Sequence, residues 1–98
     1  MKSLESLKND IMDIFHGLMY GDISYSYDNL NCALKTDICE VFNDIVEDTV
    51  MNIMLGKEVS NEQLLSLSDN LASFGDEFNV TEAKALSEKI KTSFIQPS

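Results

Sequence analysis

The chain has 98 residues, a net charge of −10 and no arginine, and its seven lysines are scattered. This length makes one domain, and the lack of clustered Lys and Arg argues against direct binding of nucleic acid or of anionic membrane surfaces. Acidic residues interrupt the N-terminal apolar residues, and no window approaches the roughly 18 apolar residues of a membrane span, so we expect a cytoplasmic protein with reduced cysteines.

Helical periodicity dominates the chain, and strand-like alternation is nearly absent. The first helix is predicted from Ser3 to about Tyr20, because apolar residues recur there at the three- and four-residue spacing of a helix face. These residues are Leu4, Leu7, Ile11, Ile14 and Leu18. Gly17 lies inside this helix and costs about 1 kcal/mol relative to alanine, so we expect the last turn to fray.

The segment from Gly21 to Asp28 is rich in residues that favour turns. We expect a packed connection rather than a strand, because the chain offers no second strand to pair with it. Three tyrosines cluster here, Tyr20, Tyr25 and Tyr27, and they are candidate aromatic contacts for a partner. Packing of Tyr25 and Tyr27 on the protein's own helices is the alternative.

The second helix is predicted to begin near Asp28 or Asn29 and to run to Leu55, with Gly56 just after its end. At about 1.5 Å per residue it would be about 40 Å long. Because this is long for so small a domain, a break near Lys35–Thr36 is the alternative.

The third helix has the clearest start signal in the chain. Ser60 is the expected N-cap, Gln63 is expected to complete a capping box, and Val59 is expected to pack on Leu64 as a hydrophobic staple. We expect this helix to end at Gly75.

The fourth helix is predicted from Thr81 to about Ile95, and Pro97 follows its end. Residues 1–98 are therefore expected to form a single all-α domain. It would be a small helical bundle or hairpin of about four helices, with a long central amphipathic helix.

The stretch from Asp37 to Leu55 carries two opposite faces. The apolar side consists of Ile38, Val41, Phe42, Ile45, Val46, Thr49, Ile53 and Met54. The opposite side, here called the acidic face, consists of Asp37, Glu40, Asp44, Glu47 and Asp48, with no Lys or Arg among them. Like charges three and four residues apart repel by a few tenths of a kcal/mol each. The acidic face is therefore the candidate surface for a protein partner, and a merely solvated helix face is the alternative.

The apolar side of this helix extends further through Cys32, Cys39 and Val50. The resulting arc is wider than two neighbouring helices of one chain would cover. We therefore expect a homodimer in which the long helices meet across a two-fold axis. The candidate dimer face consists of Cys39, Val46, Val50 and Ile53.

Catalysis, cofactors and metals have little support in the sequence. His16 is the one histidine, and a nucleophilic site needs a base, an orienting group and a nucleophile within reach. Cys32 and Cys39 lie about 10 Å apart on a helix, which is too far for a disulfide. They also lack the spacing of zinc ligands. We expect a non-enzyme without a cofactor or metal.

The junction of the second and third helices reads VMNIMLGKEVSNEQLLSL. It resembles the YmgB-type small biofilm-regulator and two-component connector proteins of enterobacteria over about Val46 to Ile90. The matching positions are Val50, Asn52, Ile53, Met54, Leu55, Gly56, Val59, Asn61, Leu64, Leu65 and Leu67. The resemblance implies a helical-hairpin homodimer that contacts regulators and has no catalytic residues.

The sequence thus predicts a non-catalytic regulator, a small bacterial or phage protein that binds a basic protein partner. The alternative is an acidic nucleic-acid mimic, or an immunity or anti-defence inhibitor of a basic nucleic-acid-binding protein. A third option is a secretion-type chaperone that holds its client on the apolar arc.

Overall fold

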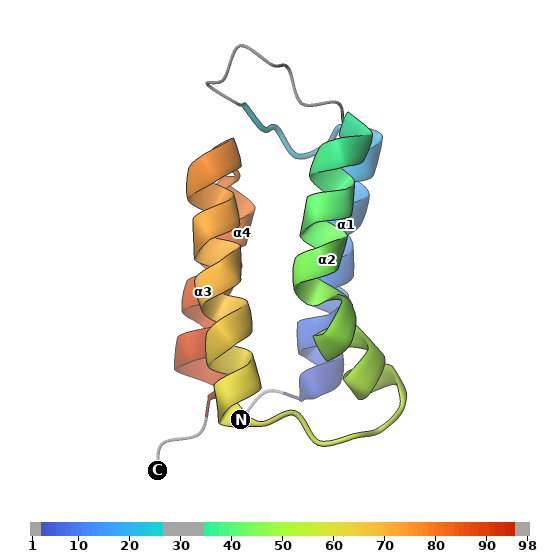
Figure 1. The fold of residues 1–98 in the computed structure, drawn as a ribbon, viewed down its shortest axis with the longest axis vertical. Coiled ribbons are helices and arrows are strands. Elements are labelled where there is room, and N and C mark those ends of the chain that lie inside the picture. The colour runs from blue at the N-terminus through green and yellow to red at the C-terminus, as the bar shows by residue number, and fades with distance from the viewer. Residues whose placement is uncertain (1–2, 27–34, 96–98) are drawn as a thin grey trace.

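The computed structural model describes residues 3–26 and 35–95, and within these ranges the chain is helical and contains no strand. The elements are α1 (Leu4–Tyr20), α2 (Lys35–Met54), α3 (Asn61–Phe78), α4 (Thr81–Lys89) and the π-helical turn η1 (Ile90–Phe94), which continues α4. The helices run alternately up and down and form two side-by-side pairs, α1 with α2 and α3 with α4 (Figure 1). The predicted all-α fold is confirmed.

One hydrophobic core joins the two pairs, and every helix contributes to it. Its largest fully buried side chains include Phe42 from α2 and Phe74 from α3. Their ring centroids lie 5.4 Å apart in an edge-to-face arrangement, and Phe78 continues the stack 5.0 Å from Phe74. Such aromatic pairs add roughly 0.5–1.5 kcal/mol beyond the area that they bury.

The expected fraying at the end of α1 does not occur. Gly17 is buried, and a Cβ atom there would lie 2.5 Å from the Ile23 side chain, which packs against the bare backbone. The Ile23 N–H also donates to the Gly17 carbonyl oxygen at 3.0 Å. The missing side chain therefore makes room for the connection, whose packing offsets the low helix propensity of glycine.

The connection after α1 is packed, as expected, over residues 21–26. The Ser26 N–H donates to the Phe78 carbonyl oxygen at 2.8 Å, and the Asn79 side-chain amide donates to the Ser26 carbonyl and hydroxyl oxygens. These bonds attach the connection to the turn between α3 and α4. The predicted beginning of the second helix at Asp28 or Asn29 lies outside the described residues.

The end of α2 confirms the expected role of Gly56. This residue has φ 72°, a left-handed conformation that glycine adopts without steric cost. The Lys57 N–H donates to the Asn52 carbonyl at 2.8 Å, and the Gly56 N–H donates to the Ile53 carbonyl at 3.1 Å. Both bonds of a Schellman motif are therefore formed.

The start of α3 follows the prediction only in part. The Ser60 hydroxyl accepts a hydrogen bond from the Gln63 N–H at 3.1 Å, so Ser60 is the N-cap. The predicted capping box is wrong, because the Gln63 side-chain amide contacts α2 and not the backbone N–H of Ser60. It accepts from the Asn52 amide at 3.3 Å and donates to the Thr49 hydroxyl at 3.5 Å. Partly buried polar groups on a neighbouring helix compete successfully with the local capping box.

The predicted end of α3 at Gly75 is also wrong, because the helix continues to Phe78 and ends at Asn79, which has φ 56°. Gly75 serves the contact between α3 and α4 instead. A Cβ atom there would lie 2.6 Å from Lys84 Cγ and 2.9 Å from the Val80 carbonyl oxygen. The glycine is therefore a packing residue, and the buried Phe78 extends the apolar face beyond it.

Two buried serines hold α3 and α4 together. The Ser68 hydroxyl lies 2.8 Å from the Ser87 carbonyl oxygen, and the Ser87 hydroxyl donates to the Ser68 carbonyl at 2.7 Å. Both side chains are at most 2% exposed. Their small size lets the helices approach, and the reciprocal bonds satisfy hydroxyls that would otherwise be costly to bury.

Replacement of Gly75 by alanine should lower the free energy of unfolding by about 1–3 kcal/mol, because the added methyl group meets backbone atoms that cannot move independently. Urea denaturation followed by circular dichroism measures the change. The matched control is Ser73→Ala on the exposed side of the same helix, which should stay within about 0.5 kcal/mol. Equal stabilities for the two variants would contradict the close approach of α3 and α4.

Candidate functional site

The carboxylates of the acidic face all lie on α2, and all are exposed: Asp37, Glu40, Asp44, Glu47 and Asp48. On the opposite side of this helix, Ile38, Phe42 and Val46 are at most 4% exposed and belong to the core. The two-sided character of α2 therefore follows the sequence pattern, with its charge directed outward.

The boundary of the apolar side differs from the prediction at two residues. Val41 is 40% exposed and Met54 is 65% exposed, whereas Thr49 is buried, as its assignment to that side implies. At about 100° per residue, Val41 lies only about 40° around the helix from Asp37, which places it beside the acidic face. Fewer apolar side chains of α2 are buried in the core than the composition of this helix predicts.

The acidic face carries charge that no described lysine neutralises. Among the side chains of residues 3–26 and 37–95 the ion pairs are Lys8–Glu5, Lys84–Asp76, Lys89–Asp10 and Lys91–Asp69. None of them includes a residue of the acidic face. The carboxylates of the face thus form no ion pair with the described lysine side chains, which leaves the face available to a cationic partner.

A polar hollow of about 360 Å³ borders the acidic face on the side of α3. Asp44 and Asp48 line its α2 wall, and Gln63, Ser66 and Asn70 line its α3 wall. The α3 wall has hydrogen-bonding groups without charge, so the negative charge comes from α2.

An apolar hollow of about 220 Å³ borders the acidic face on the side of α1. Its lining residues are Ile11, Met12, Phe15, Asn43, Val46, Glu47, Val50 and Met51. Ile11 and Val46 are almost completely buried, whereas Met12 and Met51 are exposed. A carboxylate of the acidic face therefore borders a small hydrophobic depression.

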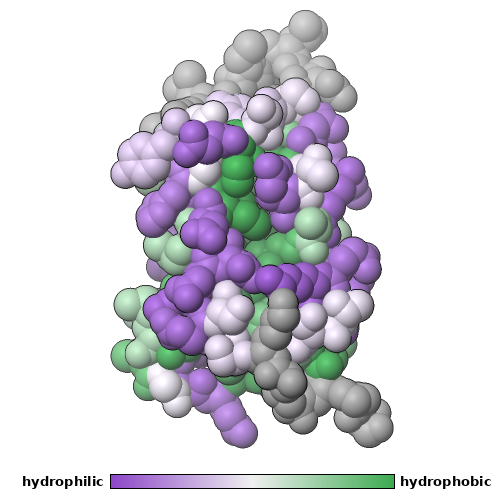
Figure 2. Space-filling model, turned by 180° about the vertical axis from the view of Figure 1, so that it is seen from behind, coloured by the Kyte–Doolittle hydropathy of each residue, from purple (hydrophilic) through white to green (hydrophobic). Residues whose placement is uncertain are grey.

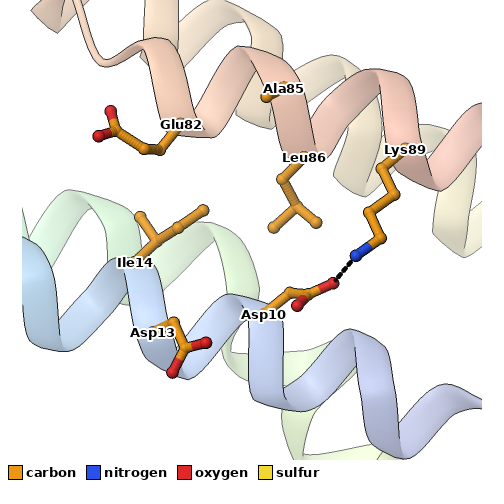
Figure 3. Close-up of a pocket in the computed structure, with 7 residues that line it drawn as sticks. All are labelled: Asp10, Asp13, Ile14, Glu82, Ala85, Leu86 and Lys89. Carbon is orange, nitrogen blue, oxygen red and sulfur yellow. Dashed lines mark hydrogen bonds and ion pairs between the residues drawn. The ribbon is translucent and has the colours of Figure 1, made fainter.

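A third hollow, of about 260 Å³, lies between α1 and α4, where hydrophobic surface shows between hydrophilic edges (Figure 2). Ile14 and Leu86 lie between the two helices, and Lys89 Nζ is 2.6 Å from Asp10 Oδ2 (Figure 3). The remaining lining residues are Asp13, Glu82 and Ala85. Sequence reasoning missed this hollow, because no local pattern tells which helix lies opposite α1.

The predicted aromatic contacts occupy different environments. Tyr20 is 71% exposed at the end of α1, whereas Tyr25 is half-buried and packs against the core. Tyr27 lies outside the described residues. The exposed His16 lies between Phe15 and Tyr20, with ring centroids 6.3 and 6.1 Å away. Tyr20 is therefore the described tyrosine that is most accessible to a partner.

The candidate dimer face is largely used by the chain itself. Cys39 and Val46 are 9% and 4% exposed and belong to the core, while Val50 and Ile53 are half-buried against it. Cys32 lies outside the described residues. Since α1 and α3 cover this side of α2, a contact between two copies would depend mainly on other side chains.

The described ranges contain neither a metal-binding cluster nor a membrane-spanning helix. No group of three or more His, Cys, Asp or Glu side chains there is close enough to hold a metal ion. None of the described helices combines the length and apolar character that crossing a membrane requires.

No family model, curated protein or solved structure matches the chain. The resemblance of Val46 to Ile90 to the YmgB-type proteins therefore stays a prediction from the sequence.

Asp44 lies at the centre of the acidic row, three or four residues from Glu40, Glu47 and Asp48. Replacement of Asp44 by asparagine should raise the free energy of unfolding at low salt by up to about 1 kcal/mol, because three repulsions are removed. The matched control, Asn43→Asp, adds a charge beside Glu40 and Glu47 and should lower stability. Thermal denaturation should show both effects shrinking at high salt. Changes that are independent of salt would contradict the electrostatic origin.

Proposed function

We propose that the chain is a non-catalytic regulatory protein that binds a basic protein partner through the acidic face of α2. The observation that supports this proposal is a row of five exposed carboxylates that no described lysine neutralises. From Asp37 to Asp48 the row spans about 16 Å of helix, at about 1.5 Å per residue. Such a row lowers the stability of the free protein, and a partner with clustered Lys or Arg would relieve the repulsion.

The acidic face would act mainly on the rate and orientation of binding. Complementary charge steers two proteins together and suppresses wrong orientations more than it adds affinity. Exposed ion pairs contribute little each, so the affinity of such a complex would need an apolar contact beside the charges. The complex should therefore weaken, but not vanish, as salt increases.

A nucleic-acid mimic, the alternative, needs carboxylates that follow a phosphate backbone over several turns. The acidic face covers about 16 Å of one helix. Across the adjacent hollow, α3 presents the neutral Gln63, Ser66 and Asn70. A chaperone would need the apolar arc of α2, yet Phe42 and Val46 pack inside the chain's own core. Of these three functions, binding of a basic protein is the best supported.

The proposal is tested by an affinity pull-down from the native cell with the triple variant Asp37→Asn, Asp44→Asn, Glu47→Gln. Less of the partner should be recovered with this variant, because three charges of the row are removed without loss of side-chain volume. The control triple variant, Glu58→Gln, Glu77→Gln, Glu88→Gln, makes the same change in net charge at exposed positions elsewhere and should retain the partner. Equal recovery of the partner with both variants, or binding that ignores salt, would rule out the acidic face.

A further inference from the structure

The methionines are distributed in an unusual way. Four lie in the described ranges, Met12 and Met19 on α1 and Met51 and Met54 on α2, and they are 36%, 39%, 48% and 65% exposed. Methionine is normally among the residues most often buried, yet none of these belongs to the core. All four lie on the same helix pair, so their exposure is a feature of one region.

Two of these methionines lie at the junction between α1 and α2. Met12 of α1 and Met51 of α2 both line the apolar hollow, together with the buried Ile11 and Val46. Phe15, which is half-buried, lines the same hollow. The hollow is thus a depression with a hydrophobic floor and flexible thioether walls.

Helical spacing extends this strip in both directions. Met19 follows the hollow-lining Phe15 by four residues on α1, and Met54 follows Val50 by four residues on α2, so each shares a helix flank with a residue of the hollow. The helices α1 and α2 run in opposite directions (Figure 1), so Met19 and Met54 extend the strip toward opposite ends of the helix pair. We call Met12, Phe15, Met19, Met51 and Met54 the methionine seam.

The charge beside the methionine seam is negative. Glu47 lines the hollow itself, and Glu40 lies two turns earlier on the same flank of α2. Lys8, one turn before Met12 on α1, is paired with Glu5 at 2.6 Å. An occupant that fits this surface therefore has apolar side chains at its centre and positive charge at its edge.

We propose that the methionine seam binds a basic amphipathic helix of the partner protein, with a large apolar side chain inserted between Met12 and Met51. This inference rests on the proposed function and names the structural class of the partner's binding segment. Unbranched thioether side chains adapt to varied apolar surfaces, and an amphipathic helix in a hydrophobic groove is a common mode of peptide recognition. Lysine or arginine on the flank of that helix pairs with Glu47 and Glu40.

Size and charge disfavour two other occupants, a small molecule and a second copy of the chain. The hollow of about 220 Å³ is smaller than the roughly 300–1,000 Å³ of typical small-molecule sites, but it suits a protruding side chain. A second copy of the chain, related by a two-fold axis, would bring the same patch against itself. That contact would bring two acidic patches, each with Glu47 and Glu40, close together in a protein with a net charge of −10.

The probe is a synthetic amphipathic helical peptide of about four turns, with leucine along one face and lysine along its flanks. Titration into the full chain, carrying ¹³C-labelled methionine methyl groups, is followed by NMR. The Met12 and Met51 resonances should shift and saturate. A control peptide with serine in place of leucine keeps the charge and should leave these resonances unmoved, because only the apolar face enters the hollow.

Variants of the seam provide the second measurement. The double variant Met12→Gln, Met51→Gln keeps side-chain length at exposed positions and should weaken peptide binding about tenfold, which is about 1.4 kcal/mol. The matched control is Leu65→Gln, a 44% exposed apolar residue on α3, which should bind the peptide unchanged. Circular dichroism checks that both variants remain folded.

Several results would overturn the inference. Unmoved methionine resonances, or equal affinities for the seam variant and Leu65→Gln, would show that the seam is not the site. Sedimentation that shows a dimer, abolished by the seam substitutions, would identify a second copy as the occupant. If the seam variant recovers the native partner fully while the acidic-face triple variant recovers less of it, the inference fails and the proposed function stands. If both variants retain the partner, both fail.

Discussion

The burial of one side of α2 against α1 and α3 is the contact on which the rest of the structure depends. Phe42 is fully buried there and meets Phe74 of α3, so this side joins the two helix pairs. A chain of this length buries a limited fraction of its surface, and isolated helices as short as α4 are marginal in water. Once this side faces the core, helical geometry turns the five carboxylates of the acidic face outward.

The outward surface of the α1–α2 pair combines two properties that stability alone does not favour. The carboxylates of the acidic face repel one another, and the methionine seam exposes hydrophobic side chains to water. They are neighbours, because Glu47 belongs to the acidic face and also lines the apolar hollow. Features that cost stability are expected where a surface serves function. Here the like-charge repulsion and the exposed methionines occur on the same helix pair. Charge for steering beside an apolar depression for affinity is a physically consistent way to bind a basic helix.

Much of the helical architecture could be predicted because its signals are local. The cap at Ser60 and the left-handed Gly56 depend on residues a few positions away, and the structure contains both. The predictions that were wrong concern residues whose contacts lie far away in the sequence. The Gln63 side chain forms hydrogen bonds with Thr49 and Asn52 of α2. Gly75 does not end α3, and its missing side chain leaves room for α4. No local sequence pattern predicts the reciprocal hydrogen bonds of Ser68 and Ser87, because each serine by itself is an ordinary polar residue of a helix.

The acidic face was visible in the sequence, whereas the hollows beside it were not. The spacing from Asp37 to Asp48 places five carboxylates on one side of any α-helix, whatever surrounds it. Only the tertiary structure decided that Cys39 and Val46 belong to the core and that Met12 and Met51 line one apolar depression. The sequence by itself determined which residues share a helix face, because the helical period is a property of the local backbone. Which neighbour covers each face depends on contacts between residues far apart in the chain, so the tertiary structure alone decided it.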